Sequence, residues 1–428
     1  MKRLELSEYG ALEAADLSLA EVVALAATRA VEVAPSLEPG RWKLRAAQRV
    51  GVVQVGATEL WVHPKVPVNR LLYLLGYARD QRGWRDDDPG FQSMAGLVPA
   101  MAVSFAALAQ RALAQGVLQG YQEEEQSLLV LRGRLREGDQ VRRRPGLALP
   151  LEVRYDDFTV DIAENRLLLS AARRLLRLPG VPSRVRAALL HLTTRLADVT
   201  ALTPGDTLPA VRRSRLNDRY QPALRLAGLI LQGHSIEMVV GGVRASGFLF
   251  DMNRIFEDFL TAVLREELAA HGGVVRGQFR AALDEAGQVP IRPDITWWQG
   301  GRCLAVVDAK YKALRPTEFP NTDLYQMLAY CKVLKLPRGH LVYAAGNEQP
   351  RTHAIRNADV EVVVHALDLA KEPSALAHDV RQLANEIALA GLDPFGRRCP
   401  LSRVAPRPVA TPPHTPASDP AAPACTHR

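Results

Sequence analysis

Lysine and cysteine are both scarce in this chain. Only eight of its 54 basic residues are Lys, so Arg carries almost all of the positive charge. One cause of such a bias is a GC-rich genome, and another is recognition of phosphate by bidentate guanidinium groups. The four cysteines form no CxxC pair and show no spacing of a structural zinc site. This usage indicates a reduced compartment, and we expect a cytoplasmic protein.

Long apolar segments are also missing from the sequence. The most apolar stretch, residues 96–118, is interrupted by Pro99, Gln110, Arg111 and Gln115, and it falls short of the ~20 apolar residues that cross a bilayer. The first eight residues, MKRLELSE, carry acids where a signal peptide would be apolar. We therefore expect neither secretion nor a membrane partner.

Several catalytic motifs are absent as well. No Gly is followed by Lys, which excludes a GxxxxGK[ST] phosphate-binding loop and an NTPase of that class. The sequence contains no HExxH, GxSxG or GxGxxG, and its ten histidines are scattered without ligand spacing. The function must therefore be sought outside these enzyme classes.

The chain does have enough apolar material for two or three folded domains. It has 428 residues, of which 47% are hydrophobic and 23% charged, and its net charge is +8. The pattern predicts a mixed α/β fold class, with an α+β region over 1–95 and a mainly helical region with a β-hairpin over 96–240. An α/β domain over 241–395 follows, and the Pro-rich tail 396–428 should be disordered.

The hairpin expected in the helical region is rich in arginine. Its strands, Ser127–Leu135 and Leu147–Tyr155, would flank the basic turn Arg142-Arg143-Arg144. Arg132 and Arg134 lie two apart on the first strand and hence on one face, where they could contact a partner or a phosphate. A plain solvated strand face explains them at least as well, and the same holds for the basic turn.

The stretch that carries chemistry is a second hairpin. Two strand-like arms flank the turn Gln299-Gly300-Gly301-Arg302. A hairpin centred on Gly301 places Asp294 directly opposite Asp308. Side chains on a strand alternate with period two, so Lys310 shares a face with Asp308. The sequence therefore predicts two carboxylates side by side with an ammonium next to them.

Two opposed carboxylates need a cation. Like charges directly opposite each other destabilise a hairpin, and a divalent metal resolves the conflict. Ligands that are oxygen only favour Mg²⁺ or Mn²⁺. Lys310 could then orient a water, help to deprotonate it, or offset negative charge that develops on a phosphate. The alternative is a solvent-facing strand pair, but Asp308 follows the apolar run Leu304-Ala305-Val306-Val307, which is expected of an interior strand.

Two helices are expected to add polar side chains to this pair. On Asp251–His271 the apolar residues form one stripe, and Glu257 lies on its edge. Glu257 could reach the site at the rim of the sheet or simply border the core. On Asn321–Leu336, Gln326 and Tyr330 are i and i+4 neighbours on one face. Ordinary helix packing explains that pair about as well as a site does.

The order and spacing of these elements are characteristic when they are taken together. They are Glu257, Pro293-Asp294, Asp308-Ala309-Lys310 and Gln326-x-x-x-Tyr330. The set resembles the PD-(D/E)xK nuclease superfamily, and its last element is similar to the QxxxY motif of the RecB-like branch. The resemblance implies a restriction-endonuclease-like domain with a central mixed sheet. It also implies that Asp294 and Asp308 bind the metal with support from Glu257, that Lys310 assists the attacking water, and that Gln326 and Tyr330 shape the site or hold DNA.

Short stretches elsewhere carry a second resemblance, over residues 40–395. They include Val62-His63-Pro64-Lys65-Val66, Leu131-Arg132-Gly133-Arg134-Leu135, Glu164-Asn165-Arg166 and Asp251-Met252-Asn253-Arg254-Ile255-Phe256-Glu257. These stretches are similar to the McrC family, the nuclease subunit of the McrBC modification-dependent (5-methylcytosine) restriction system. That similarity implies a partner, an McrB-like AAA+ GTPase ring that binds the GTP, and an N-terminal part that docks on the ring and stimulates it.

The two resemblances together imply a Mg²⁺-dependent endodeoxyribonuclease that acts on methylated double-stranded DNA. The positive net charge helps to hold duplex DNA and predicts binding that weakens with salt. Two alternatives stay open. The chain could be a stand-alone RecB-like repair nuclease that cuts without a GTPase, or a non-catalytic adaptor of a AAA+ ring.

Overall fold

The computed structural model describes residues 2–79, 96–203, 206–240, 242–312, 321–344 and 350–392. The Pro-rich tail, which the sequence predicts to be disordered, lies outside the described residues. The helices within these ranges are all too short or too polar to span a bilayer.

The first sheet of the chain has five strands. Their spatial order is β1 (Lys2–Ser7), β6 (Thr58–His63), β5 (Arg49–Val55), β11 (Val243–Asp251) and β10 (His234–Val240). β1 runs parallel to β6, and the other neighbours are antiparallel. The β10–β11 hairpin spans the boundary expected between residues 240 and 241 and belongs to this N-terminal sheet. The α/β domain therefore begins at the helix that follows β11.

A smaller sheet and a helix pack on the first sheet. The strands β2 (Ala11–Ala15), β4 (Trp42–Ala46) and β3 (Val31–Pro35) form an antiparallel sheet. Helix α1 (Leu19–Thr28) contacts β5, β10 and β11. It begins with a capping box, because Ser18 and Glu21 each bind the backbone N–H of the other.

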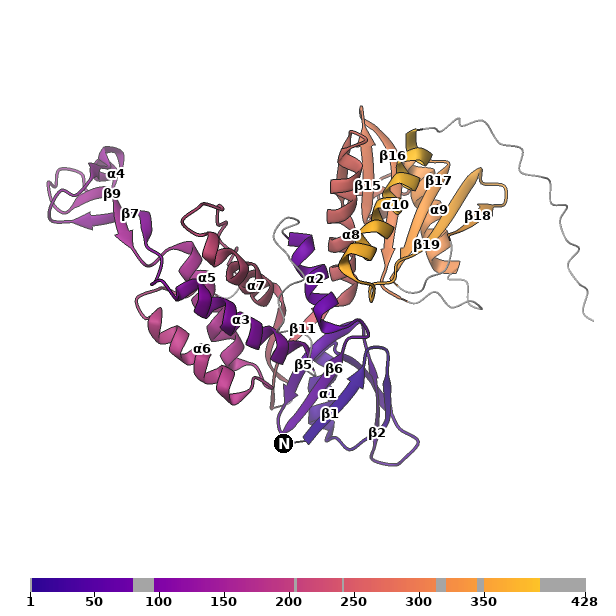
Figure 1. Ribbon diagram of the computed structural model, residues 1–428, viewed down its shortest axis with the longest axis horizontal. Coiled ribbons are helices and arrows are strands. Elements are labelled where there is room, and N and C mark those ends of the chain that lie inside the picture. Colours follow the sequence, from indigo (N-terminus) through magenta and orange to yellow (C-terminus); the bar gives the residue numbers. More distant parts are fainter. Residues whose placement is uncertain are drawn as a thin grey trace, which may run out of the picture. The chain divides into compact units, whose positions relative to one another are not determined.

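Helices dominate the next part of the chain (Figure 1). They are α2 (Val68–Arg79), α3 (Leu97–Leu113), α5 (Ala163–Arg177), α6 (Ser183–Arg195), a 3₁₀ turn at Asp218–Tyr220 and α7 (Gln221–Gln232). α5 packs between α6 and α7, and α3 contacts both of these helices. Their apolar faces share one core with the α/β domain.

A small β module is inserted between α3 and α5. In it β7 (Gly120–Leu128) pairs along its whole length with β9 (Leu151–Thr159), and the short β8 (Arg134–Leu135) pairs on the other side of β9. Helix α4 (Glu137–Arg143) lies between β8 and β9. The predicted first strand, Ser127–Leu135, is therefore wrong, because residues 129–133 lie outside both β7 and β8. β7 carries a polar run, Gln122–Gln126, so its half-buried positions are polar as well and it lacks the apolar alternation that marks a strand.

The α/β domain is built on a central mixed sheet, as the resemblance implies, and this sheet has six strands. Its order is β12 (Val274–Gly277), β15 (Ile295–Gln299), β16 (Arg302–Lys310), β17 (Arg338–Tyr343), β19 (Val360–Ala366) and β18 (Arg351–Ile355). β16, β17 and β19 are parallel to one another, and the other pairs are antiparallel. A two-stranded ribbon, β13 (Ala281–Ala282) and β14 (Pro290–Ile291), connects β12 to β15.

Helices pack against this sheet through two separate cores (Figure 1). α8 (Met252–Ala269) and α10 (Pro373–Leu392) contact each other and β16. α9 (Asn321–Leu334) contacts β16, β17 and β19. Side chains of β16 alternate between the two cores, with Val307 in the core of α8 and Val306 in the core of α9. The next residue with the orientation of Val306 is Asp308, which therefore faces the side of α9.

Candidate functional site

The turn between β15 and β16 contains two glycines in the left-handed region. Gly300 has φ 58° and Gly301 has φ 81°, and Gln299 pairs with Arg302 across the turn. Positive φ at both central residues is the requirement of a type I′ turn, whose twist matches that of the strands. The turn is centred between the two glycines, half a residue away from the centre that the sequence suggests.

A β-bulge restores the register that the sequence predicts. The pairing shifts between Trp297 and Trp298, where Leu304 is the extra residue on β16. Beyond the bulge Ile295 lies opposite Val307. Asp294 precedes β15, and continuing this register by one residue places it opposite Asp308.

The two carboxylates are held by different groups. Asp294 Oδ2 accepts a hydrogen bond from the backbone N–H of Ala309 at 2.9 Å. Asp308 Oδ2 lies 2.5 Å from the ammonium of Lys310, and the Asp308 side chain is only 2% exposed. The alternative of a solvent-facing strand pair is therefore wrong for Asp308.

Burial makes the charged form of both acids unfavourable. Desolvation, followed by the charge of Asp294, raises the pKa of Asp308 to about 7, although Lys310 opposes the shift. Desolvation, followed by the charge of Glu257, also raises the pKa of Asp294. Lys310 therefore does not fully offset the burial of the two acids, and an added cation would favour their charged forms.

The Gln-x-x-x-Tyr pair of α9 is brought to Lys310. The ammonium of Lys310 donates to Gln326 Oε1 at 2.9 Å, and Gln326 Nε2 donates to the Tyr330 hydroxyl at 2.6 Å. Tyr330 in turn donates to the carbonyl of Arg292 at 3.4 Å. Burial raises the pKa of Tyr330 to about 12, so its hydroxyl keeps its proton at neutral pH. This chain of hydrogen bonds joins α9 to the segment that carries Asp294.

Glu257 does not meet the two aspartates directly. It is half-buried at the edge of the apolar stripe of α8, as the sequence predicts. The side-chain amide of Gln278 donates to Glu257 Oε1 and, at 3.2 Å, to Asp294 Oδ1. Sequence reasoning missed Gln278 because no motif marks it. The register of β12 against β15, which places it beside Asp294, is a tertiary feature.

The donor set fits a divalent cation that prefers oxygen ligands. Asp308 Oδ2 is buried and accepts no hydrogen bond of good geometry despite its closeness to Lys310. Asp294 and Asp308 offer the carboxylate oxygens that Mg²⁺ and Mn²⁺ favour. Within the described part of the chain, no three His, Cys, Asp or Glu side chains already converge at metal-ligand spacing. The amide of Gln278 between Glu257 and Asp294 accounts for the missing third carboxylate.

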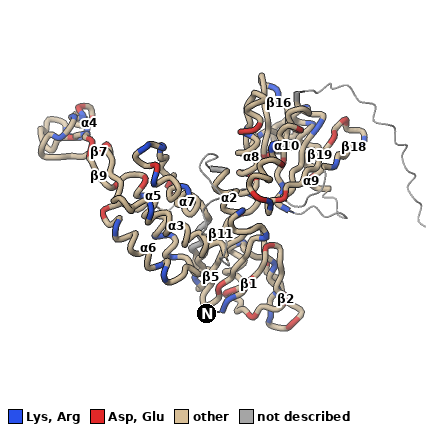
Figure 2. The backbone as a smooth tube through the Cα atoms, viewed as in Figure 1, with Lys and Arg blue, Asp and Glu red and all other residues tan. Residues whose placement is uncertain are grey.

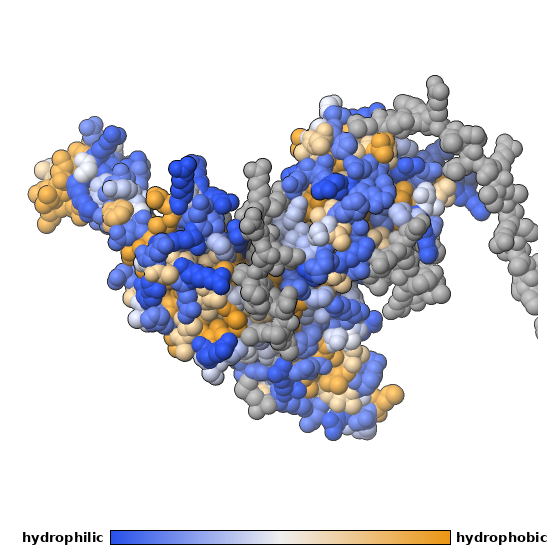
Figure 3. All heavy atoms as spheres, in the orientation of Figure 1, coloured by the Kyte–Doolittle hydropathy of each residue, from blue (hydrophilic) through white to orange (hydrophobic). Residues whose placement is uncertain are grey.

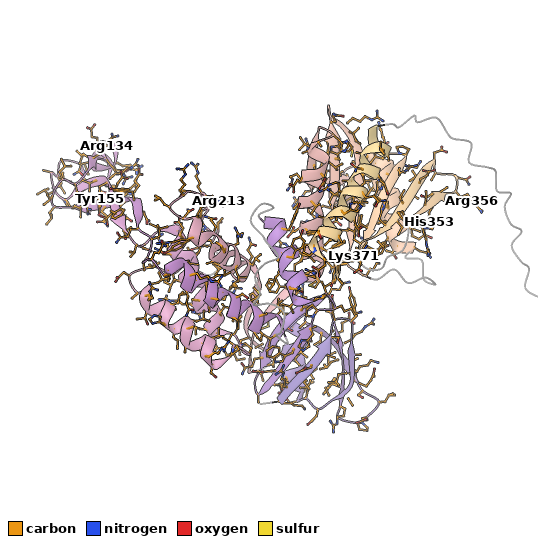
Figure 4. All side chains as sticks on the ribbon, in the orientation of Figure 1. Arg134, Tyr155, Arg213, His353, Arg356 and Lys371 are labelled. Carbon is orange, nitrogen blue, oxygen red and sulfur yellow. The ribbon has the colours of Figure 1, made fainter. Side chains whose placement is uncertain are left out.

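The prediction that Arg132 and Arg134 share a strand face is wrong. Only Arg134 belongs to β8, because Gly133 between them has φ 72° and turns the chain. Arg132 pairs with Asp157 at 2.5 Å, and its guanidinium lies 3.9 Å from the centre of the Tyr155 ring. Figure 4 shows Arg134 and Tyr155 on the β7–β9 module.

The three arginines predicted to form a basic turn instead end helix α4, with Arg144 as its C-cap, and they are paired with acids. Arg142 contacts Asp139 at 2.7 Å, and Arg143 and Arg144 contact Glu152 at 3.4 and 3.1 Å. Figure 2 shows basic and acidic positions side by side around α4. Arg143 and Arg144 therefore link α4 to β9 through Glu152.

Comparisons with known proteins found one matching family and two solved structures with some similarity. The sequence model of the family described as McrBC 5-methylcytosine restriction system component matches residues 44–344. A refined half-complex from a tetradecameric assembly of Thermococcus gammatolerans McrB AAA+ hexamers with bound McrC contains a chain similar in fold, with a TM-score of 0.58 and 19% identity. The match covers 90% of this chain and 100% of that one. The cryo-EM structure of the Thermococcus gammatolerans McrBC complex matches 62% of this chain and 88% of its own at 20% identity, with a TM-score of 0.37. No curated protein matches the chain.

Proposed function

The chain belongs to the family of McrBC 5-methylcytosine restriction system components, and we propose that it is an McrC-like subunit that cleaves DNA. The observation that carries this proposal is the pair of half-buried Asp294 and buried Asp308, with Lys310 beside Asp308 on β16. Its reaction is hydrolysis of a phosphodiester bond, in which a water oxygen attacks phosphorus and one P–O bond breaks. The cofactor is Mg²⁺, with Mn²⁺ as a substitute.

Each side chain of the site has a distinct task in this proposal. Asp294 and Asp308 hold the cation, which supplies charge neutralisation at the phosphate and an acidified water when bound. The N–H of Ala309 orients Asp294. Lys310, held between Asp308 and Gln326, donates to the attacking water or to a phosphate oxygen that gains negative charge.

Tyr330 and Gln326 keep the ammonium of Lys310 in place. Gln326 can accept from Lys310 because its own amide N–H is used by the Tyr330 hydroxyl. A flexible lysine side chain loses conformational entropy when it is fixed. Because Gln326 already holds the ammonium, less of this entropy has to be lost when the transition state forms. We assign Gln326 and Tyr330 a positioning role, and contact with DNA is a second possible task for Gln326, which is exposed.

The partner that we propose is an McrB-like AAA+ GTPase ring, which binds the GTP. A chain of similar fold is found bound to McrB AAA+ hexamers. The β7–β9 module (residues 120–159) exposes several large apolar side chains, and we propose that it docks on the partner. Leu129 and Val130 are 72% and 74% exposed, and so are Leu131, which follows them, and Leu147 and Leu149, which precede β9. Figure 3 shows apolar residues gathered at one end of this module. A protein that exposes such a cluster uses it for binding.

We expect Val130→Asp to weaken the stimulation of the partner GTPase. A charge placed in an apolar contact must be desolvated, and the concentration needed for half-maximal stimulation should rise about tenfold or more. The measurement is GTP hydrolysis by the partner at increasing concentrations of this chain. Leu389→Asp, at an equally exposed position on α10, is the matched control. Equal stimulation by the two variants would exclude the module as the docking element. Arg134, at the surface of the same module, stays a proposed partner or phosphate contact.

The experiment that tests the proposed function is reconstituted cleavage. Methylated and unmethylated plasmids are incubated with this chain and Mg²⁺, with and without the partner GTPase and GTP. We expect cleavage of the methylated plasmid only in the complete mixture. Cleavage by this chain alone would favour a stand-alone RecB-like nuclease, and stimulated GTP hydrolysis without cleavage would favour an adaptor.

A further inference from the structure

Gln278 occupies an unusual backbone position beside the site. β12 ends at Gly277, which lies opposite Ile295, and the next pair in this register is Gln278 and Asp294. The backbone N–H of Gln278 donates to the carbonyl of Asp294 at 2.7 Å. Gln278 has φ 51°, in the left-handed region that costs a residue with a side chain about 1 kcal/mol. A non-glycine residue kept in such a conformation is a reason to look for a function.

The side chain of Gln278 has one satisfied end and one unsatisfied end. Its Nε2 donates to Glu257 Oε1 and to Asp294 Oδ1. Its Oε1 is buried and has no hydrogen-bond partner. A buried carbonyl oxygen without a donor carries a desolvation cost of about 1–3 kcal/mol, so folding alone gives no reason to keep it there.

Both ends of this amide are explained if a cation enters between the carboxylates. With no cation present, the amide N–H groups are the best available partner for two carboxylates. With a cation present, an N–H pointing at it is repelled, whereas a carbonyl oxygen is a ligand that Mg²⁺ and Mn²⁺ accept. Rotation of the terminal amide exchanges the two ends at little torsional cost. A pocket of about 460 Å³ lined by Glu257, Thr261 and Gln278 leaves room for it.

We propose that Gln278, which is not part of the family motif, is an additional ligand of the metal site. Its amide bridges Glu257 and Asp294 through Nε2 in the absence of the cation and turns Oε1 onto the cation when it binds. The inference rests on the proposed function, because it requires a cation at Asp294 and Asp308. The rotation takes this N–H donor away from Glu257, which is then an outer carboxylate that supports the cation.

The test measures metal binding without DNA, GTP or partner. Mn²⁺ is titrated into the full chain, and free Mn²⁺ is followed by its electron paramagnetic resonance signal. Gln278→Met removes both ends of the amide and should raise the Kd for Mn²⁺ about tenfold or more. Gln278→Glu keeps an oxygen ligand and should bind Mn²⁺ at least as tightly as wild type. Gln288→Met, at an exposed position of the loop before β14, should match wild type.

The Gln278→Glu variant separates a ligand from a structural bridge. If the amide served only to hold the two acids through its N–H groups, a carboxylate there would repel them and would weaken Mn²⁺ binding as Gln278→Met does. That result, or a wild-type Kd for Gln278→Met, would overturn the proposal. Thermal unfolding in EDTA verifies that each variant is folded. If wild type and Asp308→Asn both fail to bind Mn²⁺, the metal site of the proposed function is itself refuted.

Discussion

Asp308→Asn should abolish DNA cleavage by the reconstituted complex while leaving the fold intact. The substitution removes a carboxylate from the centre of the proposed cation site and keeps the shape of the side chain. Charge stabilisation by a metal contributes several kcal/mol to a phosphoryl-transfer barrier, so the rate should fall by roughly 10³-fold or more. The measurement is single-turnover cleavage of methylated plasmid with the partner, GTP and Mg²⁺.

A matched variant tests whether the loss is specific to the site. Asp379→Asn removes an acid of α10 that pairs with Lys371 at 2.7 Å, and it should cleave at the wild-type rate. Stimulation of GTP hydrolysis should be unchanged in both variants, because the β7–β9 module is intact. Wild-type cleavage by Asp308→Asn would show that the nuclease site lies elsewhere.

The same substitution should change how stability depends on pH. In an acid whose pKa is raised by folding, the native state binds more protons than the unfolded state. The contribution of Asp308 is therefore fully present below the unfolded pKa of about 3.9 and is lost as pH rises through the folded pKa of about 7. Without metal, wild type should lose a few kcal/mol between pH 5 and pH 8. Asp308→Asn should lose less, which thermal unfolding in EDTA measures at both pH values.

Lys310→Met should reduce cleavage by about 10²–10³-fold without weakening metal binding. The ammonium supplies one oriented donor to charge that develops in the transition state, and loss of one such donor has an effect of this size. Removal of a positive charge next to Asp308 leaves the site more attractive to a cation, so the Kd for Mn²⁺ should stay equal or decrease. The measurements are single-turnover cleavage and Mn²⁺ titration of the same preparation.

The control for this variant lies on α9. Lys332→Met removes an exposed ammonium that donates to the carbonyl of Ala358, and it should leave both cleavage and Mn²⁺ binding unchanged. A Lys310→Met variant that fails to bind Mn²⁺ would show that the ammonium organises the acids instead of acting on water or phosphate. Reduced cleavage together with unchanged Mn²⁺ binding would therefore assign Lys310 a role in the reaction.

Much of the α/β domain could be predicted from local sequence. The stripe on α8 and the apolar run before Asp308 follow from side-chain periodicity, which is a local property of the chain. The pairing of Asp294 with Asp308 could be predicted because a short hairpin brings residues close in sequence into register. The i and i+4 relation of Gln326 and Tyr330 is likewise a property of one helix.

Other features depend on contacts between distant segments. β11 pairs with β5, almost 200 residues away in sequence, and nothing local indicates that partner. The polar strand β7 lacks an apolar face because it lies on a module that is mostly exposed. Arg132 and Arg134 are on different sides of a turn at Gly133, whose positive φ a strand pattern does not reveal.

The sequence by itself determined which residues carry charge, which strand is interior, and that two acids and a lysine meet on one hairpin. These follow from covalent order, the period of two along a strand and the geometry of a short turn. Only the tertiary structure decided that Asp308 is almost fully buried, that Lys310 meets α9, and that Gln278 stands between Glu257 and Asp294. Burial and side-chain contact across separate elements depend on how whole layers pack, and no pattern within one segment contains that information.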